Sequence, residues 1–301
     1  MVPIKLSYFE NLKRYLRLDP GLEGDVIKEI CTHLEDRSHE LKEAGLSEEE
    51  ATNIATRILG PPQLVARQIY EVYSQGTWRQ SLCAGLPHLL IALLFALHFW
   101  NNVFSLAIVL VLVVSVTIYG WCHGRPNWLF PWLGYSLVPV IATGVLLIYL
   151  PGAWSWFAIL AYVPLVLLVI ISVTKASLKR DWLFTSLMLL PLPITIGWIV
   201  ALLGNTNLLW KEQIQHFAPM IALSFSVLAI AAATFIRMRQ RWAKFGTLIV
   251  LESIVFIMIV YAGKSSVSPV TWLLIALLGL FLLIGPALLE QNFTRNHSKP
   301  A

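Results

Sequence analysis

Few side chains in the long apolar segments of this chain are of a type that does chemistry. Glu252 stands in the middle of one such segment, Gly246-Thr-Leu-Ile-Val-Leu-Glu252-Ser253, and it is the only acidic residue well inside a predicted membrane span. A carboxylate in lipid costs several kcal/mol, so Glu252 must face the bundle interior, be protonated or pair with a partner. Two interpretations remain open. Glu252 and Ser253 form a proton, cation or ligand site, or Glu252 is a neutral acid hydrogen-bonded to nearby backbone or to Ser253.

The histidines and cysteines do not have the spacing of a metal site. His88 and His98 are ten residues apart, which on a helix separates them by about 15 Å and places them roughly 80° off a common face. Cys31, Cys83 and Cys122 share no CxxC or metal-ligand spacing. The HExxH, GxSxG and P-loop patterns are absent as well. We therefore expect no catalytic residue, no metal and no cofactor, and predict that the chain is not an enzyme.

These residues belong to a chain whose composition changes near Trp78. Before that residue the sequence is charged and amphipathic, and after it about 210 residues are almost continuously apolar. Because a hydrocarbon core about 30 Å thick needs roughly 20 apolar residues per helical crossing, the second part is predicted to be a polytopic membrane domain. Its polar gaps divide it into eight candidate helices: 82–100, 102–121, 129–149, 154–173, 182–203, 217–237, 243–262 and 269–289. The predicted fold is all-α.

Charge distribution predicts how these spans are oriented. Up to residue 79 the chain has ten Lys/Arg against thirteen Asp/Glu, so the positive excess belongs to the membrane part. If the N-terminal part is cytoplasmic, the cytoplasmic loops and tail hold ten basic residues and the external loops hold only Lys211 and Lys264. This distribution obeys the positive-inside rule. It predicts that both termini are cytoplasmic, and it explains the basic excess without direct binding of nucleic acid.

A faint repeat and a pair of prolines mark the membrane part. Arg125-Pro-Asn-Trp-Leu-Phe130 aligns with Lys179-Arg-Asp-Trp-Leu-Phe184 at an offset of 54 residues, and Arg241-Trp-Ala-Lys-Phe245 is a weaker echo. Duplicated helices are common in transporters, but a basic residue before tryptophan is also typical of any helix that enters from the cytoplasm. Pro191-Leu-Pro193 predicts that the fifth span is bent or broken.

The N-terminal part has the pattern of four short helices. Apolar residues recur at helical spacing from about Asp19 to Ala44, and Gly45 ends that pattern. Ser47 and Glu50 have the spacing of a capping box that opens the next helix. Gly60-Pro-Pro62 predicts its end and the start of a further helix. A small helical domain is therefore expected ahead of the membrane spans.

The motifs of this domain resemble a known family. Glu29-Ile-x-x-His33-Leu-Glu-Asp36, Gly45-Leu-Ser-Glu-Glu-Glu-Ala51 and Leu59-Gly-Pro-Pro-Gln-Leu-Val-Ala66, after a tyrosine- and leucine-rich first helix, are similar to the HAAS-type signalling domain. That domain is also met as a prefix on bacterial permeases. The likeness covers about residues 5–75. It implies a cytoplasmic location, association with PadR-like transcription regulators and a part in signalling.

Three residues of the long helix are candidates for contact with a partner protein. They are His33, Glu35 and Asp36. The alternative is that His33 is a polar residue at a helix-packing edge and that the acidic pair is simply solvated.

These observations lead to one prediction of architecture and two of function. We predict a cytoplasmic HAAS-like domain over 1–76, a membrane domain over 77–292 and a short cytoplasmic tail over 293–301. The first functional hypothesis is a multi-pass signalling, sensor or scaffold protein of the bacterial inner membrane, whose partners are the lipid bilayer, a soluble PadR-like regulator and a second copy of itself. The alternative is a transporter or permease subunit with a regulatory prefix domain and a separate ATPase subunit.

Overall fold

A computed structural model describes residues 3–16, 18, 20–136, 164, 171, 173–174, 181–203, 210–263 and 267–296. These residues are helical or lie in turns and connections, and none of them is in a strand. The predicted all-α class is therefore confirmed for this part of the chain. The chain divides into two compact units, Met1–Gln75 and Gly76–Ala301.

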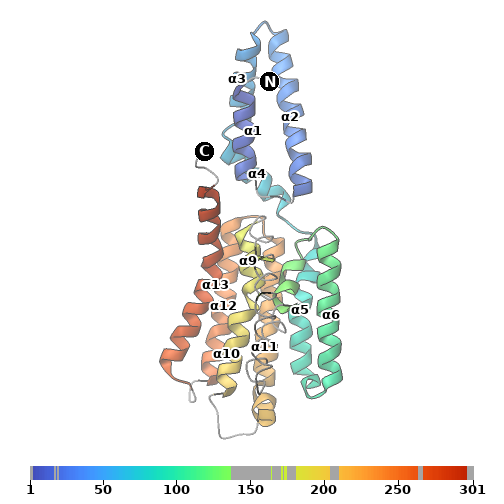
Figure 1. Cartoon of the computed structure of the whole chain (residues 1–301), viewed down its shortest axis with the longest axis vertical. Coiled ribbons are helices and arrows are strands. Elements are labelled where there is room, and N and C mark those ends of the chain that lie inside the picture. Colours follow the sequence, from blue (N-terminus) through green and yellow to red (C-terminus); the bar gives the residue numbers. More distant parts are fainter. Residues whose placement is uncertain are drawn as a thin grey trace. The chain divides into compact units, whose positions relative to one another are not determined.

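The first unit, hereafter the head, is built from two pairs of helices (Figure 1). Its helices are α1 Pro3–Tyr15, α2 Pro20–Glu43, α3 Glu48–Leu59 and α4 Pro62–Tyr73. α1 packs mainly against α4, and α2 packs mainly against α3. Leu12 is fully buried in the head's core, and the Tyr8 hydroxyl donates a 3.0 Å hydrogen bond to the Gly60 carbonyl. Burial raises the pKa of Tyr8.

The predicted capping box at the start of α3 is confirmed. The Ser47 hydroxyl oxygen accepts from the Glu50 backbone N–H at 3.3 Å, and the Glu50 carboxylate accepts from the Ser47 backbone N–H at 3.2 Å. The Ser47 hydroxyl also donates a 2.7 Å hydrogen bond to the Glu50 carboxylate, and this bond together with the one from the Ser47 backbone N–H holds the pKa of Glu50 below its usual range. α3 ends at Gly60, whose φ of 94° is a left-handed conformation that glycine adopts without strain.

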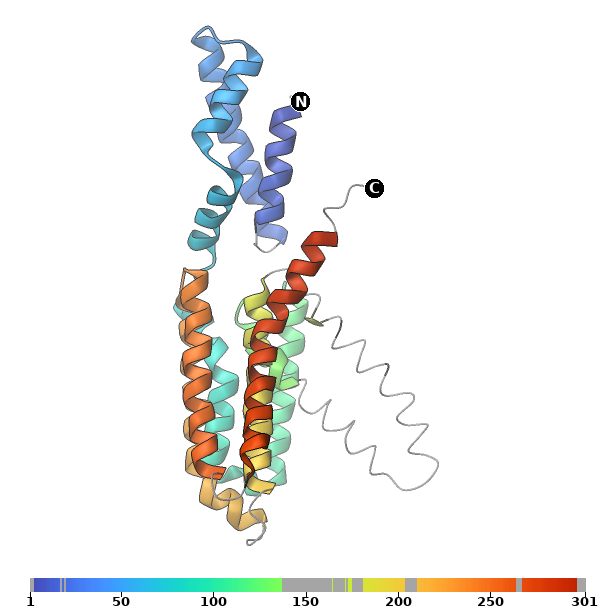
Figure 2. The same cartoon turned by 90° about the vertical axis from the view of Figure 1, so that its left-hand side faces the viewer.

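The second unit, hereafter the membrane unit, contains the apolar helices, which run side by side along its length (Figures 1 and 2). Its helices are α5 Trp78–Ala96, α6 Val103–Cys122, α9 Trp182–Leu189, α10 Pro191–Leu203, α11 Trp210–Arg237, α12 Arg241–Gly263 and α13 Pro269–Asn296, with a 3₁₀ turn at Phe99–Asn101. Residues 129–136 are helical as well.

Six helical stretches in the described residues are long and apolar enough to cross a membrane. They are Trp78–Ala96, Val103–Cys122, Trp182–Leu203, Lys211–Arg237, Arg241–Gly263 and Pro269–Leu289. The chain is thus a multi-pass membrane protein. The other two predicted spans, 129–149 and 154–173, lie largely outside the described residues, so the expected total of eight stays a prediction.

The first span begins and ends about four residues earlier than predicted. It begins at Trp78 instead of residue 82, because Thr77 and Gln80 form a capping box there. It ends at Ala96 instead of residue 100, because His98 takes a left-handed φ of 58° and breaks the helix. Hydropathy alone does not reveal either signal.

The predicted break in the fifth span is a kink. α9 ends at Leu189 and α10 starts at Pro191, and between them Leu190 keeps helical dihedrals of φ −51° and ψ −40°. Pro191 and Pro193 lack the backbone N–H that would continue the helical hydrogen bonding. The chain therefore bends at this point without unwinding.

Small residues bring α5 and α11 close together. The Ser81 hydroxyl donates a 2.6 Å hydrogen bond to the Ala233 carbonyl. One turn further on, a Cβ added at Gly85 would lie 3.2 Å from the Ala229 carbonyl oxygen. Small residues spaced four apart are what allows transmembrane helices to approach this closely. We call this contact the α5–α11 seam.

The start of the second unit is attached to the end of α11. The Gly76 N–H donates a 2.8 Å hydrogen bond to the Ile236 carbonyl, and the Arg237 guanidinium donates a 3.1 Å hydrogen bond to the Gly76 carbonyl. The same guanidinium lies 4.4 Å from the centre of the Trp78 ring. A Cβ added at residue 76 would overlap the Ile236 side chain, so a larger residue there would force this contact to shift.

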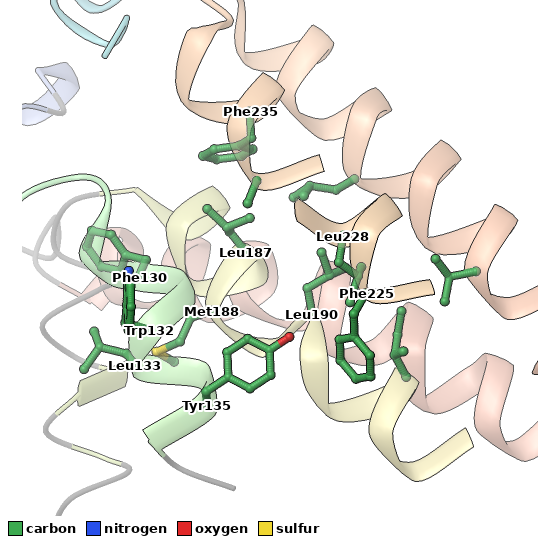
Figure 3. Packing of buried hydrophobic residues seen from close by; sticks show 14 of the residues in the cluster. Phe130, Trp132, Leu133, Tyr135, Leu187, Met188, Leu190, Phe225, Leu228 and Phe235 are labelled. Atoms are coloured by element: carbon green, nitrogen blue, oxygen red, sulfur yellow. The ribbon is translucent and has the colours of Figure 1, made fainter. Parts of the chain in front are cut away.

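Apolar side chains fill the middle of the second unit. Figure 3 shows them gathered between residues 129–136, α9 and α11. The fully or almost fully buried members include Leu129, Leu187, Met188, Leu190, Leu228 and Phe235.

Candidate ligand site in the membrane-spanning unit

Glu252 faces a crevice between α12 and α13. α10 packs against both of these helices, whereas α12 and α13 contact each other little. The space between them has a volume of about 200 Å³. The residues that line it are Pro193, Ile194, Ile249, Glu252, Ser253, Phe256, Ile257, Ile259, Ile275, Ala276, Gly279, Leu280 and Leu283. All of them are apolar except Glu252 and Ser253.

The crevice has a buried floor and an exposed rim. Ile194, Ile259 and Ile275 are buried and close its inner side. At the rim, the side chains of Ile257 and Leu280 are 66% and 52% exposed. Because the rim lies on the apolar outer surface of the unit, the crevice opens sideways, toward the lipid of a bilayer.

Glycine makes room for the Glu252 side chain. A Cβ added at Gly279 of α13 would lie 2.7 Å from Glu252 Oε1, so the carboxyl group rests against the backbone of α13. α12 has eleven residues on either side of Glu252, which places the carboxyl about 16 Å along the axis from each end of that helix. A side chain at this position is near the middle of the hydrocarbon layer.

The carboxyl group has no polar partner among the described residues. No hydrogen bond or ion pair joins Glu252 to any of them, and Ser253 is exposed at the rim without a hydrogen bond to it. The interpretation of Glu252 as an acid hydrogen-bonded to Ser253 therefore has no support in this geometry. A carboxyl group that faces an apolar crevice with its hydrogen-bonding capacity unused is suited to binding a ligand.

The sequence did not reveal a second acidic site, at Asp181. This residue caps the start of α9 and is 0% exposed, and its Oδ1 accepts a 2.8 Å hydrogen bond from the Arg241 guanidinium of α12. Arg241 and Lys244 both lie in the first turn of α12, and Lys244 is fully buried, with its ammonium group 5.2 Å from the centre of the Phe235 ring.

The segments of the faint sequence repeat meet at this cluster. Phe130 and Phe184 occupy the same position in two copies, and their rings are 4.8 Å apart. Lys244, in the third segment, lies 5.6 Å from the centre of the Phe184 ring. Trp182 and Phe245 contact each other edge to face at 5.5 Å. In the aligned segments Asp181 and Arg241 both stand directly before a tryptophan, so the repeat relates their positions. It did not indicate that the two residues form an ion pair.

The histidines of the first span are in different environments. His88 is fully buried, and its Nδ1 lies 2.7 Å from the Tyr135 hydroxyl, while Nε2 has no hydrogen-bond partner among the described residues. His98 is exposed beyond the end of α5. Within the described part of the chain, no three His, Cys, Asp or Glu side chains come together as metal ligands would.

The three candidate contact residues of the head all lie on the surface of α2. His33, Glu35 and Asp36 are exposed. His33 and Asp36 share one face with Asp25, Glu29, Glu40 and Glu43, since these positions fall within about 80° around a helix that turns 100° per residue. We call this face the acidic stripe. Glu35 lies beside it, and its Oε1 is 3.6 Å from the Cys31 sulfur.

Comparisons of the chain with protein-family models, curated proteins and solved structures find no match. The arrangement of the residues themselves must therefore carry the functional argument.

Proposed function

We propose that this chain is a sensor of the bacterial inner membrane that has no enzymatic activity. In this proposal the head is a HAAS-type domain in the cytoplasm, both termini are cytoplasmic, and the membrane unit detects a membrane-borne ligand. The head reports the bound state to a soluble regulator of the PadR-like class by direct protein contact.

The observation that carries the proposal is the crevice at Glu252. It is apolar, it opens sideways, and its lining residues include one carboxyl group and one hydroxyl group. Transporter sites gather several polar groups and unwound backbone at the midplane, on a path to water. A single carboxyl in a lateral crevice fits recognition of a ligand better than passage of one.

The surface of the head supports protein contact. The acidic stripe of α2 gives it a row of exposed carboxylates along a helix of 24 residues. Opposite charge on a partner steers association and fixes its orientation. The matching partner surface is basic, as on proteins that bind DNA.

The alternative is a transport subunit that works with a separate ATPase. One observation favours it. The kinked pair α9 and α10 contributes Pro193 and Ile194 to the crevice, and interrupted helices line the binding sites of many transporters. In this case the head would be a regulatory prefix.

Co-purification from native membranes tests the proposal with the full chain. The variant Glu29→Lys/Asp36→Lys reverses two charges of the acidic stripe at positions that have no ion pair in the described structure. Its control, Glu10→Lys/Glu49→Lys, makes the same change in charge at two exposed sites of the head away from the stripe. A sensor should recover a soluble regulator with the wild type and the control, and lose most of it with the stripe variant.

Other results would count against the sensor. A nucleotide-hydrolysing subunit recovered with all three proteins would favour transport. Recovery of the chain alone, or only of a second copy of itself, would contradict a regulator that docks on the head.

A further inference from the structure

We propose that the crevice at Glu252 binds a lipophilic amine that enters from the bilayer, with the amine nitrogen at the Glu252 carboxyl group. This inference rests on the proposed function only in taking the amine to be the signal; binding itself depends on the crevice alone.

The lining determines the body of the ligand. Eleven of the thirteen lining residues are apolar, and a dry apolar cavity of about 150 Å³ is enough to hold a benzene ring. The crevice, at about 200 Å³, therefore holds a short hydrocarbon segment. Because its rim is exposed, the rest of a longer chain can extend along Ile257 and Leu280 into the lipid.

The unpaired carboxyl determines the head group of the ligand. No Lys, Arg or His is among the lining residues, so nothing in the crevice supplies the positive charge or the donors that a carboxyl group prefers. An amine supplies both, and hydrogen bonds between ionised partners are roughly twice as strong as neutral ones. A fatty acid would bring a second carboxyl group, and an alcohol would form only a neutral hydrogen bond.

The depth of Glu252 determines how the ligand arrives. The carboxyl is about 16 Å from either end of α12, beyond the reach of lipid headgroup amines at the interface. The amine must therefore cross the hydrocarbon as the neutral base. At the site the O–H bond of the Glu252 acid breaks and an N–H bond forms, which gives an ammonium–carboxylate pair whose total charge is unchanged.

Saturable binding of radiolabelled dodecylamine to the purified full-length protein in detergent tests this site. Dodecanol and dodecanoate are the competitors, since they have the same chain with a neutral or an anionic end. Glu252→Gln removes the acid, and its control Glu212→Gln makes the same change at an exposed position at the start of α11. Ala276→Leu keeps the acid and fills the crevice.

The expected result is one saturable amine site per chain in the wild type and in Glu212→Gln. Glu252→Gln should weaken dodecylamine binding roughly tenfold or more, because it removes a charge-assisted hydrogen bond. Ala276→Leu should weaken it as well, and neither dodecanol nor dodecanoate should compete at equal concentration. The proposal is overturned if no saturable site exists, if dodecanol competes as well as the amine, or if Glu252→Gln binds like the wild type.

The two proposals fail in different ways. If the amine binds but no soluble partner co-purifies, the sensor function is wrong and the site stands. If a partner depends on the acidic stripe but the amine does not bind, the sensor stands with a different ligand.

Discussion

Two of the acidic side chains in the membrane unit, Asp181 and Glu252, lie in opposite environments. Asp181, at the start of α9, is fully buried, and its carboxylate accepts hydrogen bonds from the Arg241 guanidinium and the Leu183 backbone N–H. Glu252, in the middle of α12, faces an apolar crevice and has no polar partner in the described structure. The Asp181 carboxylate thus takes part in an ion pair between two helices, whereas the Glu252 carboxyl group makes no polar contact with the described residues.

The difference between the two regions indicates what each acid is for. A buried carboxylate that caps α9 and pairs with Arg241 of α12 helps to fix the ends of these two helices against each other. An acid without a polar partner in the described structure has a desolvation cost that no hydrogen bond or ion pair offsets there, so stability does not explain its presence. The comparison supports a structural role for Asp181 and is consistent with the ligand site that we propose at Glu252.

Removing the charge of Asp181 should have the largest effect on stability. Asp181→Asn keeps a residue that can cap α9 but removes the carboxylate that accepts from Arg241. Breaking a buried ion pair from one side costs about 3–5 kcal/mol, and we expect a value near the lower end because the Arg241 side chain is 34% exposed. Denaturant unfolding of the purified protein, followed by helical circular dichroism, measures the change.

A double-mutant cycle checks that the loss comes from this pair. Arg241→Gln alone should also destabilise the protein, and Asp181→Asn/Arg241→Gln should cost clearly less than the sum of the two single changes. Additive effects would mean that the two residues act independently, and the contrast with Glu252 would then lose its basis.

The α5–α11 seam tests whether the crevice is a local feature or a sign of loose packing throughout. In a tightly packed unit, Gly85→Val should cost about 1–3 kcal/mol, because its side chain would be forced against the Ala229 backbone. Gly246→Ala in α12 is the control, since a Cβ there meets nothing within 4 Å. The same unfolding experiment compares them. If Gly85→Val unfolds like the wild type, the unit is loosely packed and the crevice is not special.

The smallest effect should come from Glu252→Gln. With no partner to lose among the described residues, the substitution should leave the free energy of unfolding within about 0.5 kcal/mol of wild type or raise it. The measurement is again denaturant unfolding, without added ligand. A loss of more than about 2 kcal/mol would show that Glu252 is as structural as Asp181.

Local patterns predicted local structure well. The six described spans were all predicted, because each needs only a run of apolar residues. The capping box at Ser47 and the stop at Gly60 were predicted because the chemistry of a cap involves neighbours in the chain. The shifted C-terminal end of the first span depends on the left-handed φ of His98, which the hydropathy pattern does not encode. Its shifted start depends on the capping box of Thr77 and Gln80.

Long-range pairings were not predictable in the same way. Asp181 and Arg241 are 60 residues apart, and each by itself is typical of a charged position at a membrane surface. Glu252 was recognised from its position in a span, but its surroundings were not. The crevice exists because α10 separates α12 from α13 and because residue 279 is glycine, and both follow from tertiary arrangement.

The attachment of Gly76 to α11 has a mechanical consequence. The polypeptide from the head enters the membrane unit at a residue hydrogen-bonded to both Ile236 and Arg237. A pull or twist on the chain at this point is therefore borne by two helices, α5 through the covalent backbone and α11 through the hydrogen bonds. α11 also packs against α12, which carries Glu252. A displacement of α12 is therefore passed to Gly76, the residue at which the chain from the head enters the membrane unit, through the packing of α12 on α11 and the two hydrogen bonds from α11.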